Sequence, residues 1–83
     1  MAMERIDKIE KRLNGIIAQR EYFRSAGLDA AAAANRAEVQ GAVDTLADFG
    51  YKVEPTGESS LAYFRDGTVV TFNPVRIVKQ EEA

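Results

Sequence analysis

The sequence predicts one small α+β domain, an N-terminal antiparallel helical hairpin in residues 1–50 followed by a three- to four-stranded antiparallel β-meander in residues 51–79 (ααβββ). Two observations carry this prediction. Apolar residues recur every three or four positions in the first 50 residues and alternate with polar ones afterwards. Gly27 and Gly50 stand where the pattern stops or changes. A chain of 83 residues has room for a single domain, and its end, residues 80–83, is polar and expected to fray.

The first helix is expected from Met3 to Ala26, and its apolar stripe has heptad spacing. In heptad terms Arg20 falls where a further apolar residue would continue the stripe. The pattern favours a helical hairpin or a dimer interface, for which Arg20 is a candidate contact. The stripe consists of Ile6, Ile9, Leu13, Ile16, Ile17 and Phe23, of which Ile9, Ile16 and Phe23 share the d position.

The second helix is expected from about Ala30 to Phe49, after a turn in which Gly27 takes the left-handed C′ conformation and Asp29 caps the new helix. It opens with a run of five alanines of high helix propensity. So short a turn makes the two helices antiparallel neighbours. Their mid-helix glycines, Gly15 and Gly41, either make room for a partner or reflect a kink or close crossing within the domain.

The clearest turn signal is Asp66-Gly67, which fits a two-residue type I′ hairpin turn. That turn pairs Phe64 with Val69 and Tyr63 with Val70. The helical hairpin is then expected to cover one sheet face, and Phe64 and Val69 form a candidate contact surface on the other. The covered face would hold Leu61, Tyr63, Val70 and Phe72.

Two further segments complete the expected sheet. Residues 51–54 alternate as a first strand, and a loop rich in Ser, Thr and Gly follows. Pro74 argues for a break or a sheet edge, because proline lacks the N–H that a ladder needs. Residues 75–79 then continue the previous strand, form a fourth strand or pair with a neighbouring subunit.

Little catalytic chemistry is available. The chain has no cysteine and no histidine, so the usual nucleophile, general base and metal ligand are missing. Asp44 and Asp48 lie opposite the apolar face of their helix, which is typical of a solvated surface. No glycine-rich phosphate loop and no calcium-loop spacing occur. We therefore predict no enzyme, no catalytic or metal site and no cofactor.

Charge and hydropathy narrow the classes of partner. The formal net charge is −2, which gives no long-range attraction for nucleic acids. The first helix has the main basic cluster, including Arg12, Arg20 and Arg24, but interleaved acidic residues pair with it at helical spacing. No apolar run approaches the roughly 20 residues of a membrane span, and none suggests a signal peptide. We expect a cytoplasmic protein.

Residues 39–54, VQGAVDTLADFGYKVE, resemble the helix, glycine and strand junction of small uncharacterised proteins encoded by bacteriophages and other mobile elements. The resemblance covers about a fifth of the chain, and no functional residue is carried over from it. It implies a context in which small acidic proteins bind host proteins, including components of host defence.

These observations leave three hypotheses. The first is a non-catalytic protein–protein interaction module that self-associates, since a small domain without disulfides or metal gains stability by assembly. The second is a nucleic-acid-binding regulator that uses the basic side of the first helix. The third is an oligomer that binds a small anion through Arg20 or Arg36. The candidate interface residues are Ile9, Ile16, Arg20, Phe23 and Arg36 on the helices and Phe64 on the sheet.

Overall fold

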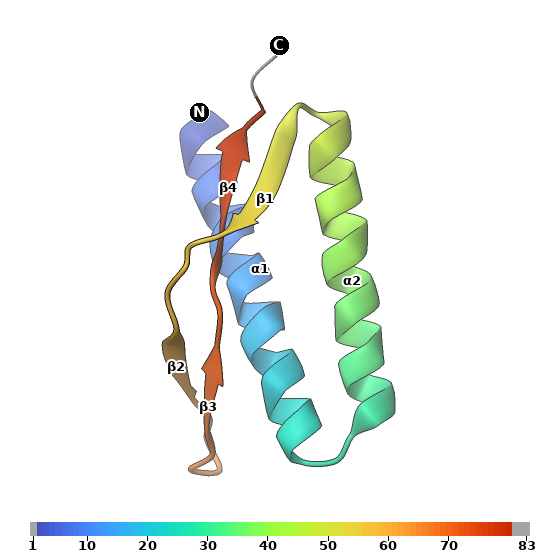
Figure 1. The fold of residues 1–83 in the computed structure, drawn as a ribbon, viewed down its shortest axis with the longest axis vertical. Helices are drawn as coiled ribbons and strands as arrows, with labels where there is room; N and C mark the ends of the chain where they lie inside the picture. The colour runs from blue at the N-terminus through green and yellow to red at the C-terminus, as the bar shows by residue number, and fades with distance from the viewer. Residues whose placement is uncertain (1, 81–83) are drawn as a thin grey trace.

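A computed structural model describes residues 2–80 and confirms the predicted fold class, a helical hairpin followed by antiparallel strands (Figure 1). The predicted fraying of the last residues falls mostly on 81–83, outside the described range. The elements in chain order are α1 (Ala2–Ser25), α2 (Asp29–Asp48), β1 (Tyr51–Pro55), β2 (Ser60–Tyr63), β3 (Val69–Phe72) and β4 (Val75–Lys79).

The turn between the helices is a Schellman motif. Gly27 has φ of +76°, as predicted, and the N–H groups of Gly27 and Leu28 donate to the carbonyls of Arg24 and Phe23 at 3.1 and 2.8 Å. The predicted cap at Asp29 is wrong. Leu28 occupies the N-cap position without a side-chain hydrogen bond, and Asp29 is the first helical residue.

The four strands form two small antiparallel sheets, with β1 paired to β4 and β2 paired to β3. The pairing is nested, so the two sheets follow one another along a long interrupted hairpin (Figure 1). Four residues, 56–59, lie opposite only Asn73 and Pro74 at the interruption. Pro74 thus separates β3 from β4, in agreement with the predicted break.

The register of the β2–β3 hairpin corrects the sequence prediction by one residue. Tyr63 pairs with Val69 rather than with Val70. The N–H of Phe64 donates to the carbonyl of Thr68 at 2.9 Å, and the N–H of Gly67 donates to the carbonyl of Phe64 at 3.0 Å. The turn therefore has three residues, a type I turn completed by Gly67 at φ of +88°. The one-residue slip moves the side chains of β2 to the opposite face, so Leu61 and Tyr63, expected on the covered face, are exposed, whereas Val69 and Val70 keep their predicted sides.

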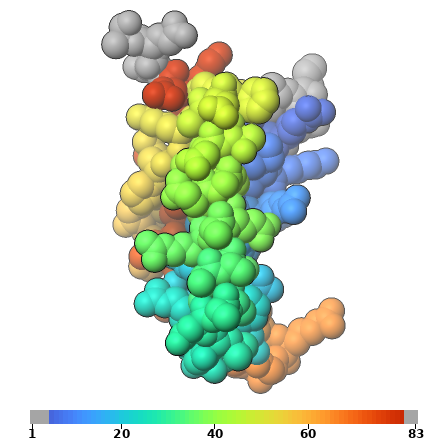
Figure 2. Space-filling view, turned by 90° about the vertical axis from the view of Figure 1, so that its right-hand side faces the viewer, coloured from blue at the N-terminus to red at the C-terminus, as the bar shows by residue number. Residues whose placement is uncertain are grey.

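The strands cover one face of the helical hairpin and leave the other face without a strand. In Figure 2, which looks onto α2, β1 lies to the left of α2 and α1 lies to its right. β3 and β4 pack on α1, and β1 packs on α2. The molecule is elongated, with extents of 43 × 23 × 22 Å. The buried apolar residues are Leu13, Ile17, Ala18, Ala32, Leu46, Val70 and Ile77.

Polar side chains of α1 dock the free edge of β4. The side-chain amide of Asn14 donates to the carbonyl of Val75 at 2.9 Å and accepts from its N–H at 2.7 Å. Glu10 accepts from the N–H of Ile77 at 2.8 Å. Asn14 thus bonds to β4 much as a neighbouring strand would. This arrangement fixes the strand layer on α1 and satisfies edge groups that would otherwise bind another chain.

Candidate functional site

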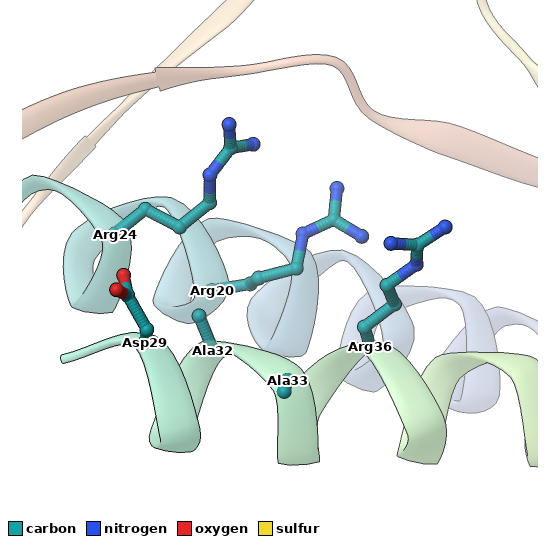
Figure 3. Close-up of a pocket in the computed structure, with 6 residues that line it drawn as sticks. All are labelled: Arg20, Arg24, Asp29, Ala32, Ala33 and Arg36. Carbon is teal, nitrogen blue, oxygen red and sulfur yellow. The ribbon is translucent and has the colours of Figure 1, made fainter.

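An arginine pocket opens at the turn end of the helical hairpin. Figure 3 shows the side chains of Arg20 and Arg24 from α1 and of Arg36 from α2 extending on the same side of the two helices. The pocket has a volume of about 550 Å³. Its full lining is Arg20, Arg24, Asp29, Ala32, Ala33 and Arg36. The side chains of Ala32 and Ala33 on α2 are small, so they leave the space between the arginines open.

The positive charge of this pocket is only partly compensated. Arg20 and Arg24 share one carboxylate, that of Glu21, at 3.5 and 3.3 Å. Nε of Arg20 is buried and makes no hydrogen bond within the described part of the chain. Arg36 makes no ion pair among residues 2–80. Asp29 contributes the one carboxylate of the lining, so the guanidinium groups retain an excess of positive charge and of N–H donors.

The first turn of α2 adds to this charge. The N-terminal end of α2 contributes three residues to the pocket lining, namely Asp29, Ala32 and Ala33. The N-terminus of a helix has a partial positive charge from its aligned peptide dipoles. Leu28 at the N-cap provides no side-chain acceptor for the free N–H groups there. The pocket is therefore the part of the described chain best suited to a small anion.

A second feature is an apolar patch on the side of the β2–β3 hairpin that faces away from α1. We call Leu61, Tyr63 and Val69 the outer patch; their exposed fractions are 55%, 75% and 48%. Tyr63 and Val69 are cross-strand partners, and Leu61 lies two residues along β2, so the three side chains share one face. Adjacent exposed apolar side chains of this size are typical of a contact surface.

The backbone edge of β2 beside this patch is open. Phe64 and Thr68 form a hydrogen-bonded pair, and such pairs alternate with non-hydrogen-bonded ones along an antiparallel ladder. The N–H and C=O groups of Leu61 and Tyr63 consequently point away from β3. Among residues 2–80, no backbone hydrogen bond outside the sheets involves either residue. The segment Ser60–Tyr63 also lacks the charged residues and proline that usually protect an edge.

Tyr22 fastens the tip of this hairpin to α1. Its ring stacks on Phe64 with centroids 4.5 Å apart, and its hydroxyl donates to Oδ2 of Asp66 at 2.6 Å. Oδ1 of Asp66 accepts from the N–H of Thr68 at 3.0 Å. The hydrogen bond from Tyr22 lowers the pKa of Asp66, and the same bond raises the pKa of the Tyr22 phenol. The patch is thus presented on an anchored hairpin.

The predicted interface residues fall in three places. Arg20 and Arg36 meet in the arginine pocket. Ile9 and Ile16 border an open groove between the helices, about 100–160° around α1 from the strand-facing residues Glu10 and Asn14 at 100° per residue. Both are half-buried.

The two aromatic candidates lie near Tyr22. Phe23 is half-buried, with its ring 5.9 Å from that of Tyr22. Phe64, expected on the solvent side of the sheet, instead lies on the α1 side because of the shifted register. The prediction that Phe64 lies on an open sheet face is therefore wrong. That face holds the outer patch instead.

The sequence placed Val69 on the outer sheet face correctly but missed Leu61 and Tyr63 there, and it missed the role of Arg24 in the pocket. The apolar alternation of residues 61–72 was visible, but it did not tell the outward residues from the inward ones. A three-residue turn at Arg65-Asp66-Gly67 would have assigned Leu61, Tyr63 and Val69 to the outside. Arg24 lies one helical turn after Arg20 on the side facing α2, a signal available once the helices are antiparallel.

Two negative findings hold for the described residues. Among the side chains that the structure describes, those of residues 5–80, no group of three or more acidic, cysteine or histidine residues is placed to hold a metal ion. Within the same range, neither helix is long and apolar enough to cross a membrane.

Comparison with protein-family models, with curated proteins and with solved structures gives no match. The resemblance of residues 39–54 to small phage-encoded proteins therefore stays a prediction. Function has to be argued from the sites of this chain themselves.

Proposed function

We propose that this protein is a non-catalytic interaction module that self-associates through the outer patch and the open edge of β2. The observation that carries the proposal is the exposure of Leu61, Tyr63 and Val69 on adjacent strands beside unpaired backbone groups. Such an edge accepts a further strand, with main-chain hydrogen bonds supplying affinity and neighbouring side chains supplying specificity.

A second copy fits this surface for reasons of symmetry and charge. Two β2 strands related by a two-fold axis run antiparallel and present the same groups to each other, as an isologous interface requires. The residues Ser60–Tyr63 have no charge, so identical strands meet without repulsion. Pairing would join two two-stranded sheets into one of four strands, a more stable unit than an isolated two-stranded hairpin.

The outer patch is a better candidate than the groove that contains Ile9 and Ile16. Both isoleucines are already half-buried within the helical hairpin, so a partner would gain less from covering them than from covering Tyr63, which is 75% exposed. Assembly through the helix groove remains a prediction of the heptad pattern.

Sedimentation equilibrium over a range from about 1 to 500 μM tests the proposal. We expect a reversible shift from the 9.1-kDa monomer to twice that mass. Tyr63→Ser should weaken self-association by about tenfold, because the symmetric interface loses the cross-strand contacts of two Tyr63 rings, each of about 0.2–1 kcal/mol. Phe49→Ser is the matched control, since Phe49 is also 75% exposed but lies at the end of α2.

The outcomes separate the candidate partners. A monomer at every concentration would rule out self-association, and an equal effect of both substitutions would rule out the outer patch as the interface. Retention of a different protein by the wild-type monomer, lost in Tyr63→Ser, would instead assign the patch to a heterologous partner. A host protein of this kind is the partner that the phage resemblance implies.

A further inference from the structure

We propose that the arginine pocket binds a small molecule bearing a phosphate group. This inference is independent of self-association, since the pocket lies on the helical hairpin and shares no residue with the outer patch. Arginine side chains from both helices meet at this pocket. Arg20 and Arg24 of α1 and Arg36 of α2 extend on the same side of the helical hairpin (Figure 3). They line a pocket of about 550 Å³.

Folding places these like charges together with incomplete compensation. The carboxylate of Glu21 forms ion pairs with both Arg20 and Arg24. Arg36 has no carboxylate partner among the described side chains, those of residues 5–80. Three guanidinium groups gathered without enough acceptors repel one another, and a bound anion relieves that repulsion. The buried Nε of Arg20 lies 3.5 Å from Glu21 without a hydrogen bond, so the weakly held Arg20 guanidinium can turn its terminal N–H groups toward an oxyanion in the pocket.

The chemistry of the donors favours phosphate over a single halide or a carboxylate. A guanidinium presents paired N–H groups that match two oxygens of a phosphate. Three such groups from two helices suit an anion with several oxygens in a tetrahedral arrangement. The first turn of α2, which has no side-chain cap at Leu28, lies at the same end of the pocket, where the Asp29 carboxylate offsets part of the helix-dipole charge.

The size and lining of the pocket point to a phosphate ester. Sites for small molecules span about 300–1,000 Å³, and this pocket lies within that range. Ala33, which is exposed, and the buried Ala32 add apolar lining beside the arginines, against which an organic group can lie. Asp29 stands at the α1–α2 turn end of the lining, where its carboxylate disfavours a second phosphate and favours a hydroxyl.

Titration of the ¹⁵N-labelled full chain with inorganic phosphate at constant ionic strength tests the site. We expect saturable shifts of the Arg20, Arg24 and Arg36 Nε–Hε signals and of the amides of Ala32 and Ala33. Arg36→Gln should weaken phosphate binding by about tenfold, the effect of losing one charge-assisted contact. Arg65→Gln is the matched control, since it removes the same charge at the exposed β2–β3 turn.

Further arms distinguish the sources of the phosphate. A nucleoside monophosphate that binds more tightly than inorganic phosphate, while the nucleoside does not bind, supports an ester. Equal binding of both phosphates supports free phosphate as the ligand. The absence of saturable shifts with either phosphate, or an Arg65→Gln effect equal to that of Arg36→Gln, would overturn the proposal. So would binding of a single-stranded oligonucleotide through these arginines without any binding of the small phosphates.

Discussion

Asp66 shows how one side chain holds the hairpin tip in place. It accepts a hydrogen bond from the Tyr22 hydroxyl with one oxygen and from the Thr68 amide with the other. Both bonds favour the charged carboxylate, which is why the pKa of Asp66 lies below its usual value in the folded protein. Ionisation of Asp66 therefore strengthens the anchoring of β2–β3 on α1, which the stacking of Tyr22 on Phe64 also supports.

This dependence gives a pH prediction. Because the folded-state pKa of Asp66 is lowered, its contribution to stability is fully present above the unfolded pKa and disappears as the pH falls through the folded value. Urea unfolding of wild type and Tyr22→Phe from pH 6 to pH 2 measures it. The free-energy difference between the two proteins should shrink toward the acid end. The exposed Tyr63, changed to Phe, is the control and should give no pH-dependent difference.

The raised pKa of Tyr22 predicts the complementary loss in base. Its contribution is present below the unfolded pKa and is lost as the pH rises through the higher folded value. Spectrophotometric titration of the phenols should show a late component from Tyr22, above the ordinary range of a phenol. That late component should disappear in Tyr22→Phe and should move back toward the ordinary range in Asp66→Asn. Persistence of the late component in both variants would contradict the Tyr22–Asp66 contact.

The structure bears on one of the two explanations offered for the glycine at position 15, a close helix crossing within the domain. A Cβ atom added at Gly15 meets no atom within 4 Å, so a close helix crossing inside the domain does not require glycine there. Gly15→Ala should raise the free energy of unfolding by about 0.5–1 kcal/mol, because alanine has the higher helix propensity. Chemical denaturation checks this value, and a destabilised variant would show that the backbone at Gly15 is more crowded than described.

The elements themselves were largely predictable. Helical periodicity, the glycine at position 27 and the Asp66-Gly67 signal each specify structure through short-range physics. The turn length was not predictable, because two-residue and three-residue hairpin loops both use a glycine with positive φ. That single residue decides whether Tyr63 faces α1 or solvent. The hydrogen bonds between Asn14 and Val75 could not be predicted from hydrophobic periodicity or turn signals, because these two residues are 61 positions apart.

The junction of α1 and β4 carries its own prediction. Asn14→Ala leaves both the N–H and the C=O of Val75 without their side-chain partner. An unsatisfied part-buried backbone group costs about 1–3 kcal/mol, so the variant should be destabilised by roughly that amount, and Val75 should lose protection from hydrogen exchange. Asn73→Ala is the control, because Asn73 is exposed and bonds only to Ser59. Equal effects of the two substitutions would contradict the docking role of Asn14.

At the scale of the molecule, the two candidate sites lie on different layers. The helical layer forms the arginine pocket at its turn end, and the strand layer presents the outer patch. A domain of 83 residues buries only a modest share of its surface. Pairing of two copies through β2 would extend the strand layer and leave the pocket open on each copy. Ligand binding and assembly are therefore separable functions in this account.

The most direct test of the central claim is an isotope-filtered NOE experiment on an equimolar mixture of labelled and unlabelled protein. It reports only contacts between copies. If β2 is the interface, intermolecular NOEs are expected at the side chains of Leu61, Tyr63 and Val69 and at the amides of β2. Intermolecular NOEs confined to Ile9 and Ile16 would place the interface on the helical hairpin instead. The absence of intermolecular NOEs at about millimolar concentration would contradict self-association altogether.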